Sequence, residues 1–415
     1  MNEIRDQHYL QAVTQLGDVR KIIANENIYS QNGIMLVASG VAIASTLYER
    51  LVKHVLLKPL DMSLSAEGMV DSDAIWDDVQ NLIRRNPKLG KMVDILDKGF
   101  SLRQTIFSIH LPAPLAFKLT VGREKFPHIY QHSLSILITG AYLARCDGMN
   151  LQEEGYVATA ALFQNIGMMH IDPGLLEPSH VMSSEERRHL YAHPLTAYLL
   201  LREFPELPRP ISDAVLEHHE RMDGRGYPRG LPGNKISRYA QVLAIAEVSA
   251  KAFDPDSATG QWQKLEMMLK LNSRQYGSGL IGFLNVLHDD SDSDATLSPI
   301  APEELVAQVR QIAKLFHDFD QQAGEGRSNE IYDFAQVRVV ELRLALLEAG
   351  FDPHDPEELI QRFARDPDCI SEYAPLLKES LWQFKSLLLE ISRRWPQEVQ
   401  SKKAEYAWVG MTGSS

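Results

Sequence analysis

Apolar residues recur at helical spacing along much of this chain, which restricts it to a mainly α fold. Two such apolar faces are formed by Ile75, Val79 and Ile83, and by Leu134, Leu137 and Ala141. Residues 157–163 and 241–252 are two further apolar segments, and neither alternates polar with apolar residues as a half-buried strand does. We therefore predict that residues 74–290 are nearly all helical.

The length of the chain, 415 residues, exceeds what one hydrophobic core normally supports, so we expect several domains. The polar stretch 63–73 is predicted to be a linker. The acidic run 289–294 is predicted to be a solvated connector, with a site for a hard cation as the alternative. The predicted regions are a small N-terminal α+β cap (1–62), a helical domain (74–290, with its core at 118–290) and a C-terminal helical region (300–415).

The cap is predicted from a turn signal near the N-terminus. Gln31-Asn32-Gly33 is typical of a hairpin turn, because Asn and Gly tolerate positive φ, and the apolar residues 34–37 that follow predict a strand. A helix is predicted from about Thr46, with an apolar face formed by Leu47, Leu51 and Val55.

The C-terminal region is interrupted at Gly324-Glu325-Gly326 and ends in a strongly amphipathic helix. The apolar seam of that helix consists of Leu377, Leu381, Phe384, Leu388, Ile391 and Trp395. A seam of this kind packs either within the chain or against a second subunit, and its short length favours packing within the chain.

Composition excludes several classes of protein. The net charge of −13 argues against a broad nucleic-acid-binding surface, so we expect no DNA partner. Cys146 and Cys369 provide neither a disulfide framework nor a zinc-finger spacing, which favours a reducing compartment. No apolar run is long enough to span a membrane, and the first residues lack the pattern of a signal peptide. We predict a cytoplasmic protein of bacterial type.

Residues 218–233 carry the strongest chemical signal, because they combine two adjacent histidines with carboxylates, arginines and a glycine-rich turn. Such a segment can hold a metal ion and lay backbone N–H groups against a phosphate. Elsewhere, His128 and His132 are four residues apart and therefore share one helical face, and His193 directly precedes a proline.

The order of these features resembles the HD-GYP family, which consists of all-helical, metal-dependent phosphodiesterases that hydrolyse cyclic di-GMP. The resemblance covers about residues 118–290 and implies a helical bundle of the HD-domain type. The matching segments are His132-Ser133, Ala160–Gly167, His193-Pro194, residues 218–233 and Ala244–Val248.

The sequence departs from the family at Gln164-Asn165. Here the family has a His-Asp dyad, which supplies a terminal metal ligand and a carboxylate that bridges two metal ions. Two divalent ions about 4 Å apart repel each other by roughly 17 kcal/mol at an effective dielectric constant near 20. Since Glu247 is the one charged residue among the ligand positions implied, we predict one divalent transition-metal ion (zinc, manganese or iron) or none.

The resemblance also implies which residues bind the metal. The candidate ligands are His132, His193, His218, His219 and Glu247, with His128 as a further candidate at a position where many relatives carry an acidic ligand. No residue is assigned as catalytic, because Gln164 and Asn165 occupy the positions of the dyad.

The ligand-binding half of the motif is better preserved. The candidate ligand-binding residues are Arg221, Asp223, Arg225, Gly226, Tyr227 and Pro228. The arginines can reach a phosphate, and Tyr227 either stacks on a base or seals the loop against the core. Met168 and Met169 follow Gly167 where the family has a phosphate-binding lysine; His170 is either its partial substitute or a solvent-facing histidine.

Two functions therefore remain open. The first is a degenerate HD-GYP-like signalling protein that binds cyclic di-GMP, a similar cyclic dinucleotide or a protein partner, with catalysis lost or impaired. The second is a metal-dependent cyclic di-GMP phosphodiesterase with an altered, mononuclear site. A third possibility is that the loop is retained only as a scaffold. We expect a protein partner, and a homodimer is compatible with the sequence.

Overall fold

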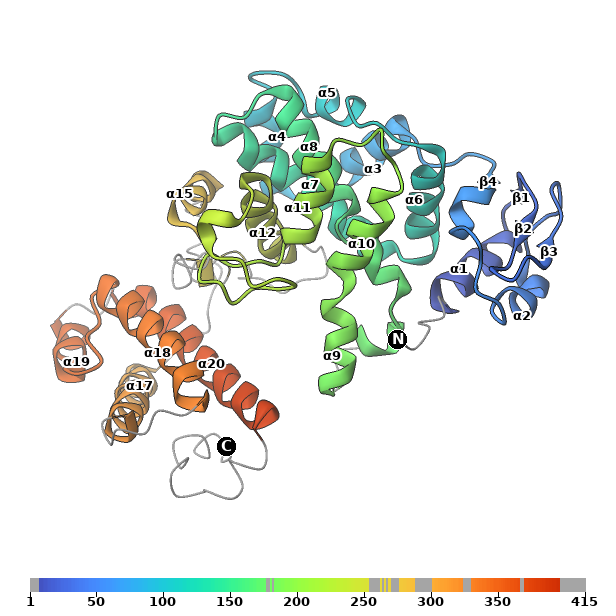
Figure 1. Ribbon diagram of the computed structural model, residues 1–415. Helices are drawn as coiled ribbons and strands as arrows, with labels where there is room; N and C mark the ends of the chain where they lie inside the picture. The colour runs from blue at the N-terminus through green and yellow to red at the C-terminus, as the bar shows by residue number, and fades with distance from the viewer. Residues whose placement is uncertain are drawn as a thin grey trace. The chain divides into compact units, whose positions relative to one another are not determined.

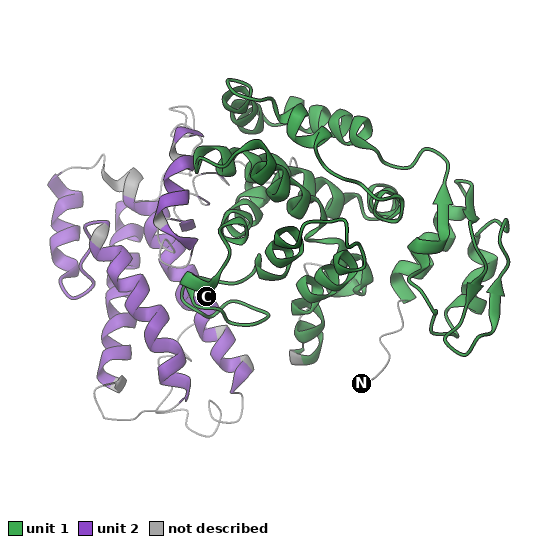
Figure 2. Cartoon of the chain, turned by 45° about the horizontal axis from the view of Figure 1, so that its top comes forward, with its two compact units in different colours: residues 1–257 green, residues 258–415 purple. Residues whose placement is uncertain are grey.

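A computed structural model of the protein divides the chain into two compact units, residues 1–257 and 258–415, which are shown separately coloured in Figure 2. The structure describes residues 7–176, 180, 183–253, 262, 265, 268, 269, 276–287, 301–323, 330–365 and 369–395. The acidic run 289–294 and Gly324-Glu325-Gly326, both singled out in the sequence, lie outside these residues. The predicted mainly α fold with an HD-domain-like helical bundle is confirmed.

The first unit begins with a small α+β cap. Its elements are α1 (Gln7–Gly17), β1 (Ile22–Ala24), β2 (Ile28–Tyr29), β3 (Met35–Val37), η1 (Ser45–Leu47), α2 (Tyr48–Leu51), η2 (Leu60–Ser63) and β4 (Leu64–Ala66). Strands β2 and β3 pair antiparallel around Gly33, whose φ of 78° requires a residue without a Cβ. The predicted hairpin is therefore confirmed.

Two predictions for the cap are wrong. The helix expected from Thr46 ends at Leu51, because residues 55–57 instead run along β2, where Gln31 donates its N–H to the carbonyl of Val55. The expected linker 63–73 contains strand β4, which pairs antiparallel with β1. Both segments are held by partners distant in sequence, so their local composition did not reveal them.

The remainder of the first unit is a helical bundle (Figure 1). Its helices are α3 (Ser72–Arg85), α4 (Pro87–Leu96), α5 (Leu102–Phe107), α6 (Ala113–Lys125), α7 (Pro127–Cys146), α8 (Leu151–Phe163), α9 (Ser184–Tyr191), α10 (His193–Arg202), α11 (Arg209–Glu217) and α12 (Arg238–Ala250). Helix α7 packs against α8 and α12 and is buried along most of its length. It begins at Pro127, since proline needs no N–H acceptor in the first turn.

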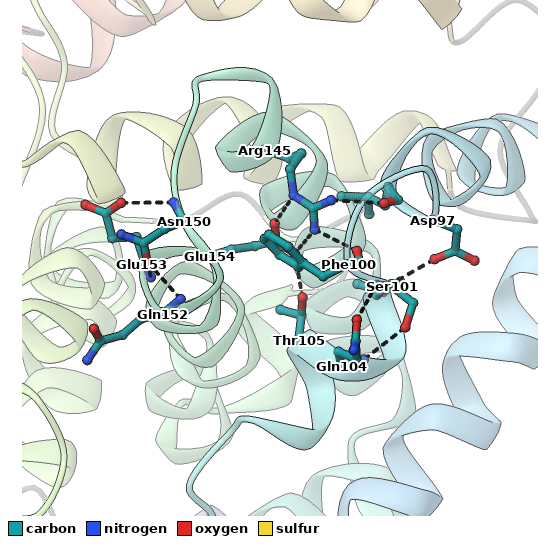
Figure 3. A network of polar contacts seen from close by, with 12 residues as sticks. Asp97, Phe100, Ser101, Gln104, Thr105, Arg145, Asn150, Gln152, Glu153 and Glu154 are labelled. Carbon is teal, nitrogen blue, oxygen red and sulfur yellow. Dashed lines mark hydrogen bonds and ion pairs between the residues drawn. The ribbon is translucent and has the colours of Figure 1, made fainter.

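A buried ion pair joins the end of α7 to the start of α8 (Figure 3). Arg145, near the end of α7, donates to both carboxylate oxygens of Glu154, at 2.7 and 3.1 Å, and to the carbonyls of Leu96 and Phe100. Burial raises the pKa of Glu154, while the hydrogen bonds from Arg145 and Thr105 oppose that shift. One guanidinium therefore ties α4, α7 and α8 together.

The cap is joined to the bundle by a second buried ion pair. Lys118 of α6 and Asp61 of η2 lie 2.8 Å apart, with side chains 3% and 7% exposed. The Lys118 ammonium also lies 3.6 Å from the centre of the Tyr9 ring, and the Tyr9 hydroxyl donates to Asp61. Cap and bundle therefore share a charged, desolvated contact.

The second unit has a hydrophobic core of its own. Its elements are α15 (Ser278–Ile281), η7 (Gly282–Leu287), α17 (Pro302–Ala323), α18 (Glu330–Glu348), α19 (Pro356–Arg365) and α20 (Cys369–Arg394). The α20 seam packs into this core, with Leu377, Phe384, Leu388 and Ile391 buried and Leu381 and Trp395 partly buried against it. The prediction that the seam packs within the chain is confirmed. Among the residues that the structure describes, no helix combines the length and apolar character needed to cross a membrane.

Candidate metal and ligand site

Five elements of the bundle bring polar residues distant in sequence to one place. Helix α7 carries His132, α12 carries Glu247, and α10 begins with His193. Gln164-Asn165 directly follows the end of α8, and His218-His219 directly follows the end of α11. These are the residues that were predicted from the sequence to occupy the positions of the family's dyad and metal ligands.

Three histidines form a compact cluster. His193, His218 and His219 each offer one ring nitrogen, and these nitrogens all lie within 4.8 Å of one another. His193 Nδ1 lies 2.7 Å from the carbonyl of Leu190, and His218 Nδ1 lies 2.6 Å from that of Val215. Because those Nδ1 atoms donate to backbone, the two Nε2 atoms, 3.4 Å apart, present lone pairs to each other.

Burial keeps the cluster neutral. Desolvation, with a smaller contribution from the charge of His218, lowers the pKa of His193 to about 4. Desolvation likewise lowers the pKa of His218 and holds that of His219 well below its ordinary value. At neutral pH all three rings are therefore in the unprotonated form that binds metal ions.

Glu247 lies beside this cluster with both carboxylate oxygens engaged. Its Oε1 lies 3.0 Å from Nε2 of His132, and its Oε2 accepts from the Gln164 amide at 2.7 Å and from the Asn165 amide at 3.4 Å. Burial acts to raise the pKa of Glu247, but the charge and hydrogen bond of His132 hold it well below its usual range. The carboxylate is therefore ionised.

Two features of the 164–167 turn shape the site. The side-chain oxygen of Gln164 is buried and has no hydrogen-bond partner in the described part of the chain. Gly167 lies so close to the first residue of α10 that a Cβ there would be 2.2 Å from the carbonyl oxygen of His193. The glycine therefore allows the turn to approach the histidine cluster.

The 220–233 loop is organised by two glutamates that sequence reasoning missed. Glu220 is 2% exposed and accepts the backbone N–H groups of Arg229, at 2.7 Å, and Leu231, at 2.8 Å. Glu217 pairs with the Arg229 guanidinium and accepts the Ser237 N–H at 2.9 Å. A carboxylate that ends an apolar helix just before a glycine-rich loop is the one sequence signal that could have indicated this role.

Close backbone approach explains two glycines of the loop. A Cβ on Gly226 would lie 2.3 Å from Cα of Glu220, and Gly224 has a φ of 75°. Either position therefore excludes a larger side chain without a backbone shift.

An aromatic stack borders the histidine cluster. The Tyr227 ring, which precedes a cis peptide bond to Pro228, lies over His219 with centroids 4.6 Å apart. Tyr191 stacks on the other side of Tyr227 at 4.3 Å. Tyr191, at the end of α9, was not predicted as a site residue because nothing in its local sequence links it to the loop.

The remaining predicted ligand-binding residues lie on the same loop. The Asp223 carboxylate accepts the N–H of Arg225 at 2.9 Å, which closes a local turn. Nε of Arg221 is buried without a hydrogen-bond partner among the described residues. This atom is a donor available to an anion.

Two other histidines lie apart from the cluster. His128 is exposed, one turn before His132 on α7, and does not belong to the metal-capable group. The His170 ring stacks on Tyr9 with centroids 4.7 Å apart, and its Nε2 lies 3.3 Å from Nζ of Lys118. His170 therefore contacts the cap.

The helical bundle brings His193, at the start of α10, and His218-His219, after the end of α11, beside a carboxylate. Residues 123–276 match the family model described as an HD domain, so this part of the chain carries an HD domain, and it is similar to cyclic-dinucleotide phosphodiesterases.

Relatives of known activity support this assignment. The chain is 29% identical over 120 residues to 3′3′-cGAMP-specific phosphodiesterase 1 of Vibrio cholerae, an alignment that covers 29% of this chain and 27% of the relative. It is 28% identical over 164 residues to the cyclic di-GMP phosphodiesterase PA4108 of Pseudomonas aeruginosa, covering 40% of each chain. The chain thus spans less than half the length of either relative.

Among solved structures, the chain is similar to Bd1817, an HDG"Y"P protein of Bdellovibrio bacteriovorus. The TM-score is 0.35 at 16% identity, over 64% of this chain and 94% of that one.

The donor set fits a single divalent ion. HD domains typically bind divalent metals, and three neutral imidazoles whose nitrogens lie within 4.8 Å of one another can ligate one transition ion. The side-chain oxygen of Gln164, which has no hydrogen-bond partner among the described residues, is a further neutral donor atom for such an ion. A second ion would need a bridging carboxylate, and the oxygens of Glu247 already accept amide and imidazole hydrogen bonds.

Proposed function

We propose that this protein is a cyclic-dinucleotide signalling protein that binds its ligand at the 220–233 loop beside at most one metal ion, with hydrolysis lost or impaired. One observation carries the proposal: the amides of Gln164 and Asn165 donate hydrogen bonds to Glu247. In the family pattern these positions hold a histidine and an aspartate.

The electrostatics follow from these contacts. An amide brings no negative charge, and its N–H group repels a cation placed against the same carboxylate oxygen. Two divalent ions about 4 Å apart repel each other by roughly 17 kcal/mol at an effective dielectric constant near 20. The single carboxylate of Glu247 offsets only a small part of that repulsion, which supports one ion or none.

The loop itself supports ligand binding. Glu220 and the stacked rings of Tyr191, Tyr227 and His219 hold the backbone of the loop. The loop is therefore ordered before a ligand binds, and binding does not carry the free-energy cost of ordering it. Nε of Arg221 is buried and has no hydrogen-bond partner among the described residues. Charge-assisted hydrogen bonds to phosphate are the strongest hydrogen bonds that a guanidinium makes, so a phosphate group is a suitable partner for this atom. We propose the ligand-binding set as Arg221, Asp223, Arg225, Gly226, Tyr227 and Pro228.

The neutral histidine cluster supports a second candidate, a phosphodiesterase with a mononuclear site. When bound, one zinc, manganese or iron ion would supply Lewis-acid stabilisation of phosphate charge. The residues of the chain would hold that ion through His193, His218 and His219, and Arg221 would orient the phosphate. Under either function, we propose that the signal passes to a protein partner, which can be a second copy of the chain.

Calorimetric titration of the purified protein with cyclic di-GMP and 3′3′-cGAMP, with and without Mn²⁺, tests the proposal. We expect binding without turnover, and we expect Arg221→Ala to weaken it about 10-fold or more, as removal of a charge-assisted hydrogen bond does. The matched control is Arg209→Ala, since the Arg209 side chain is 73% exposed on α11 and pairs with Asp213.

Two results discriminate between the candidates. Absence of binding with and without Mn²⁺ would reject ligand binding and leave the loop as a scaffold. Hydrolysis that persists through purification and disappears in His218→Ala would establish the mononuclear phosphodiesterase in place of the receptor.

A further inference from the structure

A cavity of about 330 Å³ lies on the side of α7 opposite His132. Tyr130 and Leu134 line it, and each is two positions from His132, which places them about 160° away from His132 around the helix. The cavity lies between α3, the end of α6 and the start of α7. Its remaining lining residues are Asp78, Asn81, Leu82, Arg85, Arg123, Pro127 and Gln131.

The charged groups of the cavity leave an excess of positive charge. Arg123 donates to Oδ1 of Asp78 at 2.7 Å, and the Tyr130 hydroxyl donates to Oδ2 of Asp78 at 3.0 Å. Both oxygens of the one carboxylate are therefore engaged, and its charge is offset by Arg123. Arg85, in the last turn of α3, makes no ion pair within the described part of the chain.

We propose that this cavity binds a small organic anion, with a phosphate or carboxylate group held by Arg85 and Arg123. Leu82, Leu134 and Pro127 provide apolar contacts for the body of the ligand, and Asn81 and Gln131 provide amide hydrogen bonds. The volume is at the lower end of the range for small-molecule sites, about 300–1,000 Å³, so a ligand no larger than a mononucleotide is expected. This site is independent of the cyclic-dinucleotide proposal.

Calorimetry on the full chain at low ionic strength, with chelator present, tests this inference. The probes are inorganic phosphate, 5′-GMP and citrate, which separate phosphate from carboxylate recognition. We expect saturable binding of at least one probe, weakened about 10-fold by Arg85→Gln, the effect of one charge-assisted hydrogen bond. Asn81→Trp, which fills the cavity from α3, should abolish it.

Matched controls locate the binding. Arg85 and Asn81 are exposed, so both variants should fold, and unchanged thermal midpoints will verify this. Arg103→Gln removes an equal charge from α5 outside the cavity and should bind as the unmodified protein does. The inference is overturned if none of the three probes binds, or if Arg85→Gln and Asn81→Trp leave the affinity unchanged.

Discussion

At the scale of single residues, the chemistry of the site depends on what stands at positions 164 and 165. A carboxylate at 165 would be a second anion beside Glu247, whereas the amides present there act as hydrogen-bond donors to it. The same atoms that complete the hydrogen bonding of Glu247 thus reduce the charge available to metal ions.

The double substitution Gln164→His with Asn165→Asp should restore binding of a second ion. It adds an imidazole and a carboxylate next to Glu247, which lowers the repulsion between two ions. Metal content per chain, measured after dialysis against Mn²⁺, should rise from one to two, and hydrolysis of cyclic di-GMP should appear. A stoichiometry that stays at one would contradict this account of the two amides.

Removal of one imidazole from the cluster should weaken metal binding strongly. We expect His218→Ala to reduce the affinity by more than about 100-fold, since loss of residues that merely support the ligands already reduces it by about 10–100-fold. Competition with a chelator of known affinity measures this effect. His128→Ala is the matched control, because His128 is exposed and outside the cluster; an equal loss in both variants would show that the cluster is not the site.

The buried histidines should make the metal-free protein less stable in acid. Their pKa values are lowered in the folded state, to about 4 for His193, while in the unfolded chain they are near 6.5. Below pH 6.5 the unfolded state therefore binds protons that the folded state does not, and stability is lost as the pH falls toward 4. Each histidine contributes up to about 1.4 kcal/mol per pH unit.

Urea unfolding in the presence of chelator, at pH values from 7.5 to 4.5, measures this loss. The slope of unfolding free energy against pH should be smaller in His193→Gln, which lacks one of the titrating rings. Equal slopes in the two proteins would show that His193 titrates normally in the folded state.

At the scale of helices and turns, close contact between the 164–167 turn and α10 positions His193. Gly167→Ala would place a Cβ 2.2 Å from the His193 carbonyl and push the turn away from the helix. We expect a loss of about 1–3 kcal/mol in the free energy of unfolding, as for overpacked cores, together with weaker metal binding. Gly279→Ala, where a Cβ would meet nothing within 4 Å, is the control for the thermal measurement.

Elements with local signals could be predicted from sequence. The start of α7 at Pro127, the hairpin at Gly33 and the apolar seam of α20 each depend on residues close together in the chain. Strand β4 and the extended residues 55–57 could not be predicted, because each is defined by pairing with a segment far away in the chain. The partners Tyr29 and Leu57 are 28 residues apart, and Ile22 and Ala66 are 44 residues apart.

The residues of the candidate site also divide into those that the sequence predicts and those that it does not. The histidines and the 164–165 amides were found because their local motifs resemble those of a family. Glu217, Glu220 and Tyr191 were missed because their roles arise from contacts with the folded loop, which no local motif encodes.

At the scale of the whole molecule, the two units should respond separately to substitutions that destabilise their cores. Phe316 is fully buried in the second unit and contacts the Phe384 ring edge-on, with centroids 4.9 Å apart. Phe316→Ala should destabilise that unit by about 3–5 kcal/mol while leaving the metal affinity of the first unit unchanged. Calorimetric unfolding with a parallel metal titration checks both, and a matching fall in metal affinity would show that the units depend on each other.

The family model begins at residue 123, and both partners of the ion pair between Lys118 and Asp61 lie upstream of that boundary. A fragment that kept α6 but lacked the cap would leave the Lys118 ammonium without its carboxylate partner. His170, which touches both Lys118 and Tyr9, would lose its cap contacts only a few residues from Gln164 and Asn165. The smallest fragment that reproduces the behaviour of this site therefore starts within the cap, upstream of the sequence by which the family is identified.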